Sequence, residues 1–398
     1  MGNNVYKKPN SFVYLLYRLI CKTYGKVRLN IKKGVNEAKG IKDSYVLLCN
    51  HESSIDFFAS ASMIDRKAIF VVSDSYYKTI CIRPLLDKCR VIPKQQFQTS
   101  TSSLKNMKHA LDNNLPLVIY PTGLMTADGE TTPLPDATGK AIKWLNKDVY
   151  IGCIKGSYLT NPKWGKVKRK GKITFEIKKL ISKEDMTKYT TDQLQEMIEQ
   201  ALYFDAYKNQ LENPIVYKNG DNLEGLEGVL YKCPKCGKEF TITSKNKNTL
   251  VCMECGNEAK ANKYGLLEKV KEEDVIYNLP SDWSRYIKTN LEDEIKSNDN
   301  YSLHDECDIH IIVGNKYTKV GEGTISLNKD KITLQGKIND EDILKEYKTS
   351  SFITLPFVPN SRFEIQDGQI SYRIYPKNKI ETTKWINSIE ILYRLNKN

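Results

Sequence analysis

A histidine and an aspartate stand five positions apart at the end of an apolar run, in the segment VLLCNHESSIDFFA at residues 46–59. A neutral imidazole can take a proton from a hydroxyl group, and a carboxylate beside it fixes the tautomer and stabilises the imidazolium. A strand end followed by a tight loop and a helix start brings residues i and i+5 together. His51 and Asp56 are therefore predicted to form a general-base dyad, although this spacing alone is short and common.

Short apolar segments alternate with helical patterns around this motif. Strands are expected at residues 45–49, 68–72, 116–120, 149–154 and 172–177, and helices at about 54–64, 75–87, 101–114, 137–146 and 183–212. This alternation predicts an α/β domain, with a mostly parallel sheet flanked by helices, over residues 41–215.

The form Asn-His-x-Ser-x-x-Asp-Phe-Phe resembles the signature of the glycerolipid acyltransferases, the 1-acyl-glycerol-3-phosphate acyltransferase family. Three segments resemble the family's later blocks in the same order: CRVIPKQQ at 89–96, YPTGLMT at 120–126 and VYIGCIKGSY at 149–158. The resemblance implies direct acyl transfer from acyl-CoA or acyl-carrier protein to a hydroxyl, with His51 as the base and Asp56 orienting it. A backbone N–H near Gly123 would stabilise the oxyanion.

The resemblance also implies a substrate-binding set, and the sequence departs from the family there. The expected residues are Asn50, Arg90, Lys94, Pro121, Thr122, Gly123 and Lys155, with Lys140 as a further candidate cation. Thr122 replaces the family's usual glutamate, and Met125 stands where an arginine is usual. The acceptor therefore stays open between 1-acyl-glycerol-3-phosphate, which would give phosphatidic acid, and a glycolipid or other lipid.

Four of the ten cysteines form two C-x-x-C pairs, each followed by a glycine: Cys233 with Cys236, and Cys252 with Cys255. Four thiolates suit a tetrahedral structural Zn²⁺ in a zinc ribbon over residues 228–265, with iron or a redox pair as alternatives. The other six cysteines are scattered, and no secretory signal is recognisable at the N-terminus. These features indicate a reducing, cytoplasmic compartment.

The formal net charge of +13 suggests a polyanionic partner. Residues 1–40 contain nine Lys or Arg and one acid, around an amphipathic pattern at 11–27, which fits a helix docked on an anionic membrane surface or one packed on its own domain. A second basic stretch at 162–183 contains Trp164, which suits a bilayer interface or stacking on a base. The resemblance favours peripheral contact with the inner face of the cell membrane, and nucleic acid is not expected as a partner.

The last hundred residues change to short strand-like stretches, at 307–313, 322–327, 331–335, 352–355, 363–366 and 370–375, followed by a helix containing Trp385. This pattern resembles a pleckstrin-homology-like domain over residues 301–398, reached through a linker helix in 266–300. Trp385, Ile386, Ile389 and Leu392 are expected to face inward.

Two further hypotheses stand beside glycerolipid acylation. One keeps the dyad but changes the acceptor lipid. The other is a basic, non-catalytic zinc-ribbon binding protein whose first half has lost its activity, and the presence of both His51 and Asp56 argues against it.

Overall fold

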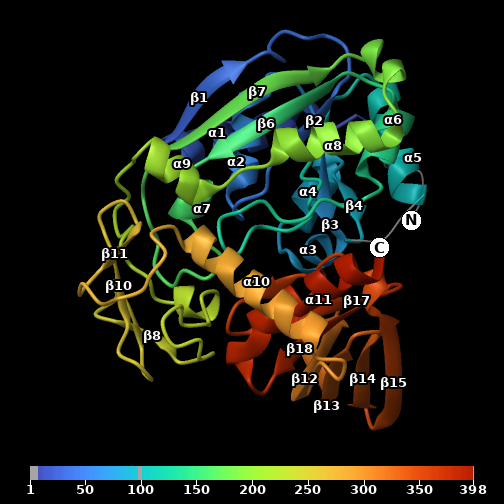
Figure 1. Cartoon of the computed structure of the whole chain (residues 1–398). Helices are drawn as coiled ribbons and strands as arrows, with labels where there is room; N and C mark the ends of the chain where they lie inside the picture. The colour runs from blue at the N-terminus through green and yellow to red at the C-terminus, as the bar shows by residue number, and fades with distance from the viewer. Residues whose placement is uncertain (1–7, 97–100, 398) are drawn as a thin grey trace. The chain divides into compact units, whose positions relative to one another are not determined.

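The computed structural model describes residues 8–96 and 101–397, so the first seven residues of the expected N-terminal segment lie outside it. The described chain divides into two compact units (Figure 1). Unit 1 contains residues up to 162 together with 169–218, and unit 2 contains residues 163–168 together with those from 219 onward.

Unit 1 is built on a seven-stranded sheet with the order β1-β7-β6-β2-β5-β3-β4. The strands are β1 (Ile31–Asn36), β2 (Val46–Cys49), β3 (Ile69–Ser73), β4 (Ile92–Lys94), β5 (Leu117–Ile119), β6 (Val149–Lys155) and β7 (Ile173–Ile181). Strands β6, β2, β5, β3 and β4 are parallel, whereas β7 runs antiparallel to β6. The predicted α/β class, with mostly parallel strands, is confirmed.

Helices cover both faces of this sheet. They are α1 (Ser11–Val27), α2 (Asp56–Met63), α3 (Asp74–Thr79), α4 (Arg83–Cys89), α5 (Thr101–Asp112), α6 (Thr138–Leu145), α7 (Ser157–Thr160), α8 (Thr191–Leu202) and α9 (Ala206–Glu212), with a 3₁₀ turn η1 (Asp185–Lys188). Leu47 packs into a core formed with α1 and α2, whereas its neighbour Leu48 packs into a core with α5, α6 and α8. Strand β2 reads as an unbroken apolar run because it is buried on both faces.

The structure corrects two of the expected elements of unit 1. The helix expected over 183–212 is three separate pieces, because the Asp205 side chain accepts from the N–H groups of Tyr207 and Lys208 and starts α9 anew. The helix expected at 75–87 is two helices, α3 and α4, and Pro84 lies in the first turn of α4.

Unit 2 contains two antiparallel sheets. The smaller has the order β11-β10-β9-β8, and the larger has the order β15-β14-β13-β12-β18-β17-β16. The strands are β8 (Ile242–Lys245), β9 (Thr249–Cys252), β10 (Glu258–Ala261), β11 (Leu267–Lys269), β12 (Ser302–Val313), β13 (Lys316–Asn328), β14 (Lys331–Ile338), β15 (Glu341–Lys348), β16 (Phe357–Val358), β17 (Arg362–Asp367) and β18 (Ile370–Pro376). The helices are α10 (Pro280–Ser297) and α11 (Thr382–Lys397), with 3₁₀ turns η2 (Leu226–Gly228), η3 (Thr349–Ser351) and η4 (Lys379–Glu381).

Helix α11 packs on the larger sheet. The four side chains expected to face inward are all buried: Trp385, Ile386, Ile389 and Leu392. The strand expected at 352–355 is instead a loop, and strand β15 was not predicted. Exposed residues, most of them charged, alternate along β15 with residues that are only partly buried, which is the pattern of an edge strand and gives a weak sequence signal.

The structure places Trp164 differently from the position expected at a bilayer interface or against a base. Its side chain is only 5% exposed, and it packs with Leu226 and Leu230 in the apolar core of unit 2. Interface insertion or base stacking by Trp164 is therefore wrong. No helix in the described ranges has the length and apolarity required to cross a membrane.

Candidate active site

Several of the predicted site residues lie at one edge of the unit 1 sheet. His51 follows β2, Thr122 follows β5, and Lys94 and Lys155 are the last residues of β4 and β6. These four strands are parallel, so their carboxyl ends lie at the same edge. This edge is where open α/β sheets usually carry their ligands.

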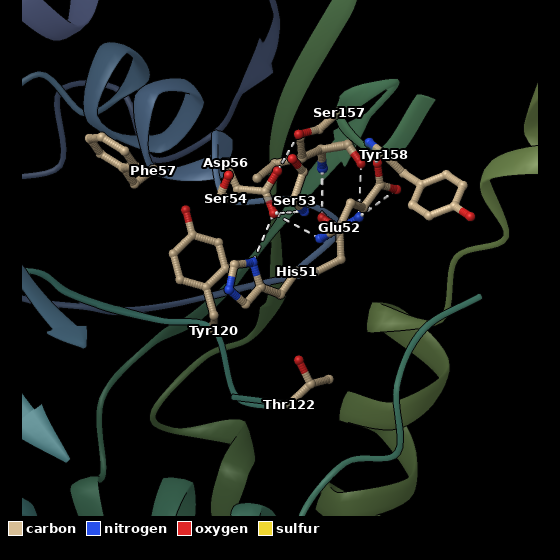
Figure 2. Close-up of polar contacts among 12 residues, drawn as sticks. His51, Glu52, Ser53, Ser54, Asp56, Phe57, Tyr120, Thr122, Ser157 and Tyr158 are labelled. Atoms are coloured by element: carbon tan, nitrogen blue, oxygen red, sulfur yellow. Dashed lines mark hydrogen bonds and ion pairs between the residues drawn. The ribbon is translucent and has the colours of Figure 1, made fainter. Parts of the chain in front are cut away.

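His51 and Asp56 meet at this edge as predicted. The Nδ1 atom of His51 lies 2.9 Å from Oδ2 of Asp56, the first residue of α2 (Figure 2). The Asp56 side chain is fully buried, whereas that of His51 is 21% exposed. The dyad therefore combines a carboxylate shielded from water with an imidazole that a substrate can reach.

The loop between the two residues holds the carboxylate in place. Oδ2 of Asp56 also accepts hydrogen bonds from the backbone N–H groups of Glu52, at 2.7 Å, and Ser53, at 2.9 Å. Because Oδ2 accepts from both N–H groups, it is placed to accept from His51 as well, with the imidazole proton on Nδ1 and the lone pair of Nε2 left to act as a base. Figure 2 shows the second ring nitrogen directed away from Asp56.

The imidazole is also held from the β5 side. The rings of His51 and Tyr120 lie 4.7 Å apart between centroids, and the Tyr120 hydroxyl lies 2.8 Å from Oγ of Ser60 on α2. Burial raises the pKa of Tyr120 well above its usual value, so this hydroxyl stays protonated. The N–H of Thr126 donates to the carbonyl of His51 at 3.2 Å.

Sequence reasoning missed three polar side chains around the dyad: Glu52, Tyr120 and Ser157. Glu52 is buried beside Asp56, and its Oε2 accepts from the N–H of Tyr158 at 3.0 Å. Burial, with the charge of Asp56 as a second cause, raises its pKa well above the usual value. All three lie inside the quoted motif segments. Their place in these segments is the one sequence feature that could have marked them as site residues.

The segment after β5 forms a compact turn. Thr122 is buried, and its hydroxyl donates to the carbonyl of Leu124 at 3.1 Å. Gly123 has a φ of +67°, and its N–H donates to the carbonyl of Tyr120 at 2.9 Å. The N–H of Gly123 itself is thus engaged in the turn, so the oxyanion donor expected near it must be another group. Pro121 lies partly buried at the start of this turn.

The remaining predicted binding residues have different surroundings. Asn50 is buried and bonded to the backbone of Ile154, and Lys155 pairs with Glu176 at 3.5 Å. Lys94 is partly buried, and desolvation lowers its pKa. Arg90 caps α4 in a left-handed conformation with a buried Nε that has no hydrogen-bond partner. Lys140 is an exposed residue of α6.

The comparison with family models identifies this part of the chain. Residues 26–193 match the model of the acyltransferase family. The match includes the dyad and all four quoted motif segments, and it covers less than half of the 398 residues. The predicted acyltransferase domain is confirmed at this level, while the choice of donor and acceptor stays a prediction.

Two solved structures show a distant likeness to part of this chain. The 1-acyl-sn-glycerophosphate (LPA) acyltransferase PlsC of Thermotoga maritima is 14% identical, over 48% of this chain and 78% of that chain, with a TM-score of 0.41. An SsgA-like sporulation-specific cell division protein of Thermobifida fusca YX-ER1 is 11% identical, over 25% of this chain and 84% of that chain, with a TM-score of 0.15. No curated protein matches. Both structural likenesses are too weak to indicate a function.

Unit 2 contains a group of four cysteines. The Sγ atoms of Cys233, Cys236, Cys252 and Cys255 lie within 4.8 Å of one another. The Cys233–Cys255 and Cys236–Cys252 pairs have Sγ distances of 3.7 and 3.8 Å. Four thiolates around one Zn²⁺, each about 2.3 Å from it, would be separated by similar distances. The group could therefore hold a metal ion.

Proposed function

We propose that this protein transfers a fatty acyl group from acyl-CoA or acyl-carrier protein to the hydroxyl of a lysophospholipid, with 1-acyl-glycerol-3-phosphate as the leading acceptor and phosphatidic acid as the product. The observation that carries the proposal is the hydrogen bond of 2.9 Å between His51 Nδ1 and a fully buried Asp56. The match of residues 26–193 to the acyltransferase family supports it.

The chemistry needs one base and no acyl-enzyme. Nε2 of His51 takes the acceptor's hydroxyl proton as the oxygen attacks the thioester carbonyl. A C–O bond forms, the C–S bond then breaks, and the imidazolium returns the proton to the departing thiolate. Asp56 stabilises the imidazolium throughout, as the buried carboxylate does in other His-Asp pairs.

A second acceptor class is favoured by the turn after β5. Thr122 carries no charge, and its hydroxyl already donates a hydrogen bond to the carbonyl of Leu124. Lys155 already pairs with Glu176. These observations support a glycolipid or other lipid without a phosphate at the reacting end, whereas Lys94 at the end of β4 supports a phosphate.

The purified protein should be incubated with labelled acyl-CoA and lysophosphatidic acid, and in parallel with a total lipid extract as an acceptor pool. His51→Ala and Asp56→Ala are expected to abolish product formation. His304→Ala is the matched control, because His304 is an exposed residue of β12 in unit 2. Labelled phosphatidic acid supports the first acceptor, another labelled lipid supports the second, and equal activity in wild type and dyad variants contradicts both. If wild type stays inactive with every donor and acceptor, the non-catalytic binding protein is the remaining hypothesis.

Peripheral attachment to an anionic membrane, on the inner face of the cell membrane, is part of the proposal. Helix α1 exposes apolar side chains at helical spacing, including Phe12 at 75%, Leu15 at 66% and Leu19 at 59%. Lys22 and Lys26 lie on the same helix. Apolar groups that enter the interface beside lysines that meet anionic headgroups are typical of membrane-docking helices.

Sedimentation with vesicles tests this attachment. Wild type is expected to bind phosphatidylglycerol vesicles more strongly than phosphatidylcholine vesicles, and Leu15→Asp with Leu19→Asp is expected to release it. Leu211→Asp is the control, because Leu211 is 58% exposed on α9. Binding unchanged by the α1 substitutions would contradict the proposal.

Unit 2 is proposed to contain a structural zinc ribbon at residues 228–265 and a pleckstrin-homology-like domain at 301–398. The four-cysteine group supports the first assignment. The strand order of the larger sheet and the closing helix α11 support the second. Because four thiolates leave no open coordination position, the metal would stabilise the fold rather than take part in acyl transfer.

A further inference from the structure

Ser157 makes an unusual contact for a helical serine. It is the first residue of the short helix α7, directly after β6, and its side chain is fully buried. Its hydroxyl donates to Oδ1 of Asp56, the carboxylate oxygen that is not bonded to His51 (Figure 2). Thr160, in the same helix, instead donates to the carbonyl of Gly156 at 2.7 Å, which is the ordinary arrangement for a helical hydroxyl.

The contact completes the hydrogen bonding of the carboxylate. Oδ2 of Asp56 accepts from His51 and from the N–H groups of Glu52 and Ser53, all close to it in sequence. The bond from Ser157 comes from a residue 101 positions away and reaches the other oxygen. A carboxylate held at both oxygens cannot rotate about its terminal bond, so the direction of the bond to His51 is fixed.

The backbone turn before Ser157 requires a glycine at position 156. Gly156 has a φ of +85°, and a Cβ atom there would lie 2.5 Å from both the carbonyl of Lys172 and the hydroxyl of Tyr217. Glycine alone adopts this conformation without strain. The close turn directs the next residue, Ser157, back toward Asp56.

We propose that Ser157 is a positioning residue, which acts through Asp56 to hold the His51 imidazole in its reactive orientation. Its kinetic consequence rests on the proposed acyl transfer, whereas its effect on the His51 ring does not. The site then contains a chain of hydrogen bonds from Ser157 to Asp56 and from Asp56 to His51, in which only the histidine would contact the substrate. The serine is not a nucleophile here, because its hydroxyl is buried behind the carboxylate.

The kinetic test compares two hydroxyl deletions in one helix. Ser157→Ala is expected to lower kcat roughly tenfold with little change in KM, because a hydrogen bond to a charged group is lost. Ser157→Cys keeps a similar volume but donates weakly, so it is expected to fall between Ser157→Ala and wild type. Thr160→Val removes the neighbouring hydroxyl at constant volume and is expected to leave kcat unchanged.

A spectroscopic test separates this inference from the acyl transfer itself. The chain has four histidines, so protein with nitrogen-labelled imidazoles gives at most four Nδ1 signals, and His51→Gln identifies the one from His51. Ser157→Ala and Ser157→Cys are expected to move the Nδ1 signal of His51 alone, and Thr160→Val to move none. If wild type is inactive with every acceptor, the proposed function fails, and the ring signals still decide the role of Ser157. An unmoved His51 signal in folded Ser157→Ala, or in Ser157→Cys where the alanine variant does not fold, would overturn the inference.

Discussion

Asn50 and Ile154 hydrogen-bond in both directions across the ends of β2 and β6. Nδ2 of Asn50 donates to the carbonyl of Ile154 at 2.8 Å, and the N–H of Ile154 donates to Oδ1 of Asn50 at 2.7 Å. Both residues are buried. The amide thus continues the sheet pairing one step beyond the last strand residue, directly before His51.

Asn50→Ala would leave the N–H and the carbonyl of Ile154 unpaired in the interior. Two buried groups without partners cost roughly 2–4 kcal/mol in free energy of unfolding, which urea denaturation can measure. Asn113→Ala is the control, because the Asn113 amide bonds only one turn back, to the His109 carbonyl. Equal midpoints for the two variants would show that the Asn50 pairing contributes little.

Asp56→Asn is expected to abolish acyl transfer while leaving the fold intact. The amide oxygen of an asparagine would replace Oδ2 and keep the bonds from Glu52, Ser53 and His51, while its NH₂ would face the hydroxyl of Ser157. The initial rate should fall by about a thousandfold or more, because the neutral amide no longer stabilises the imidazolium that forms during proton transfer. A fall of less than tenfold would mean that Asp56 serves mainly to anchor α2.

The buried carboxyl of Glu52 should make the free energy of unfolding depend on pH. Burial raises its pKa in the folded protein well above the usual 4.5. The folded state therefore holds more protons than the unfolded state once the pH exceeds about 4.5, so the free energy of unfolding falls as pH rises. Glu52→Gln removes this proton uptake, and its melting temperature should decline less than that of wild type between about pH 5 and pH 8.

The control for Glu52 is Glu196→Gln, which changes an exposed carboxylate on α8. Its melting curve is expected to follow that of wild type at each pH. If Glu52→Gln also follows wild type, the buried carboxyl is not the source of the pH dependence.

Metal binding by unit 2 is expected at one zinc ion per chain, measured by elemental analysis of protein purified without chelator. Cys252→Ser should lose the zinc, since it removes one of four ligands, and residues from 219 onward should become sensitive to protease. Cys81→Ser is the control, because Cys81 is an exposed free thiol of unit 1. Full zinc content in Cys252→Ser would contradict the proposed site.

The dyad could be predicted from sequence because its residues are local. His51 and Asp56 lie on one strand-loop-helix segment, so pattern and spacing place them together, and the resemblance of the surrounding motif to the acyltransferase signature marks them as a dyad. Ser157 and Tyr120 reach the same site only through the order of strands in the sheet. A single sequence does not reveal that β6 and β5 flank β2, so their contributions required the structure.

Elements with weak patterning were missed for a different reason. Strand β1 reads IKKGVN, with most of its residues exposed at the sheet edge, and it lacks an apolar face that would mark it. Strand β4 is three residues long and includes Pro93. Central strands such as β2 are recognisable because burial on both faces demands unbroken apolar sequence.

Helix α10 belongs to two hydrophobic cores of unit 2 at once. Trp283 and Ile287 pack with the cysteine-bearing segment, and Leu291 and Ile295 pack with the larger sheet. A chain cut within α10 would remove buried side chains from one of the two cores. Neither half of unit 2 is therefore expected to fold after transfer to another protein by recombination. We expect residues from 219 onward to be inherited as a single piece, together with Trp164, whose side chain belongs to the same core.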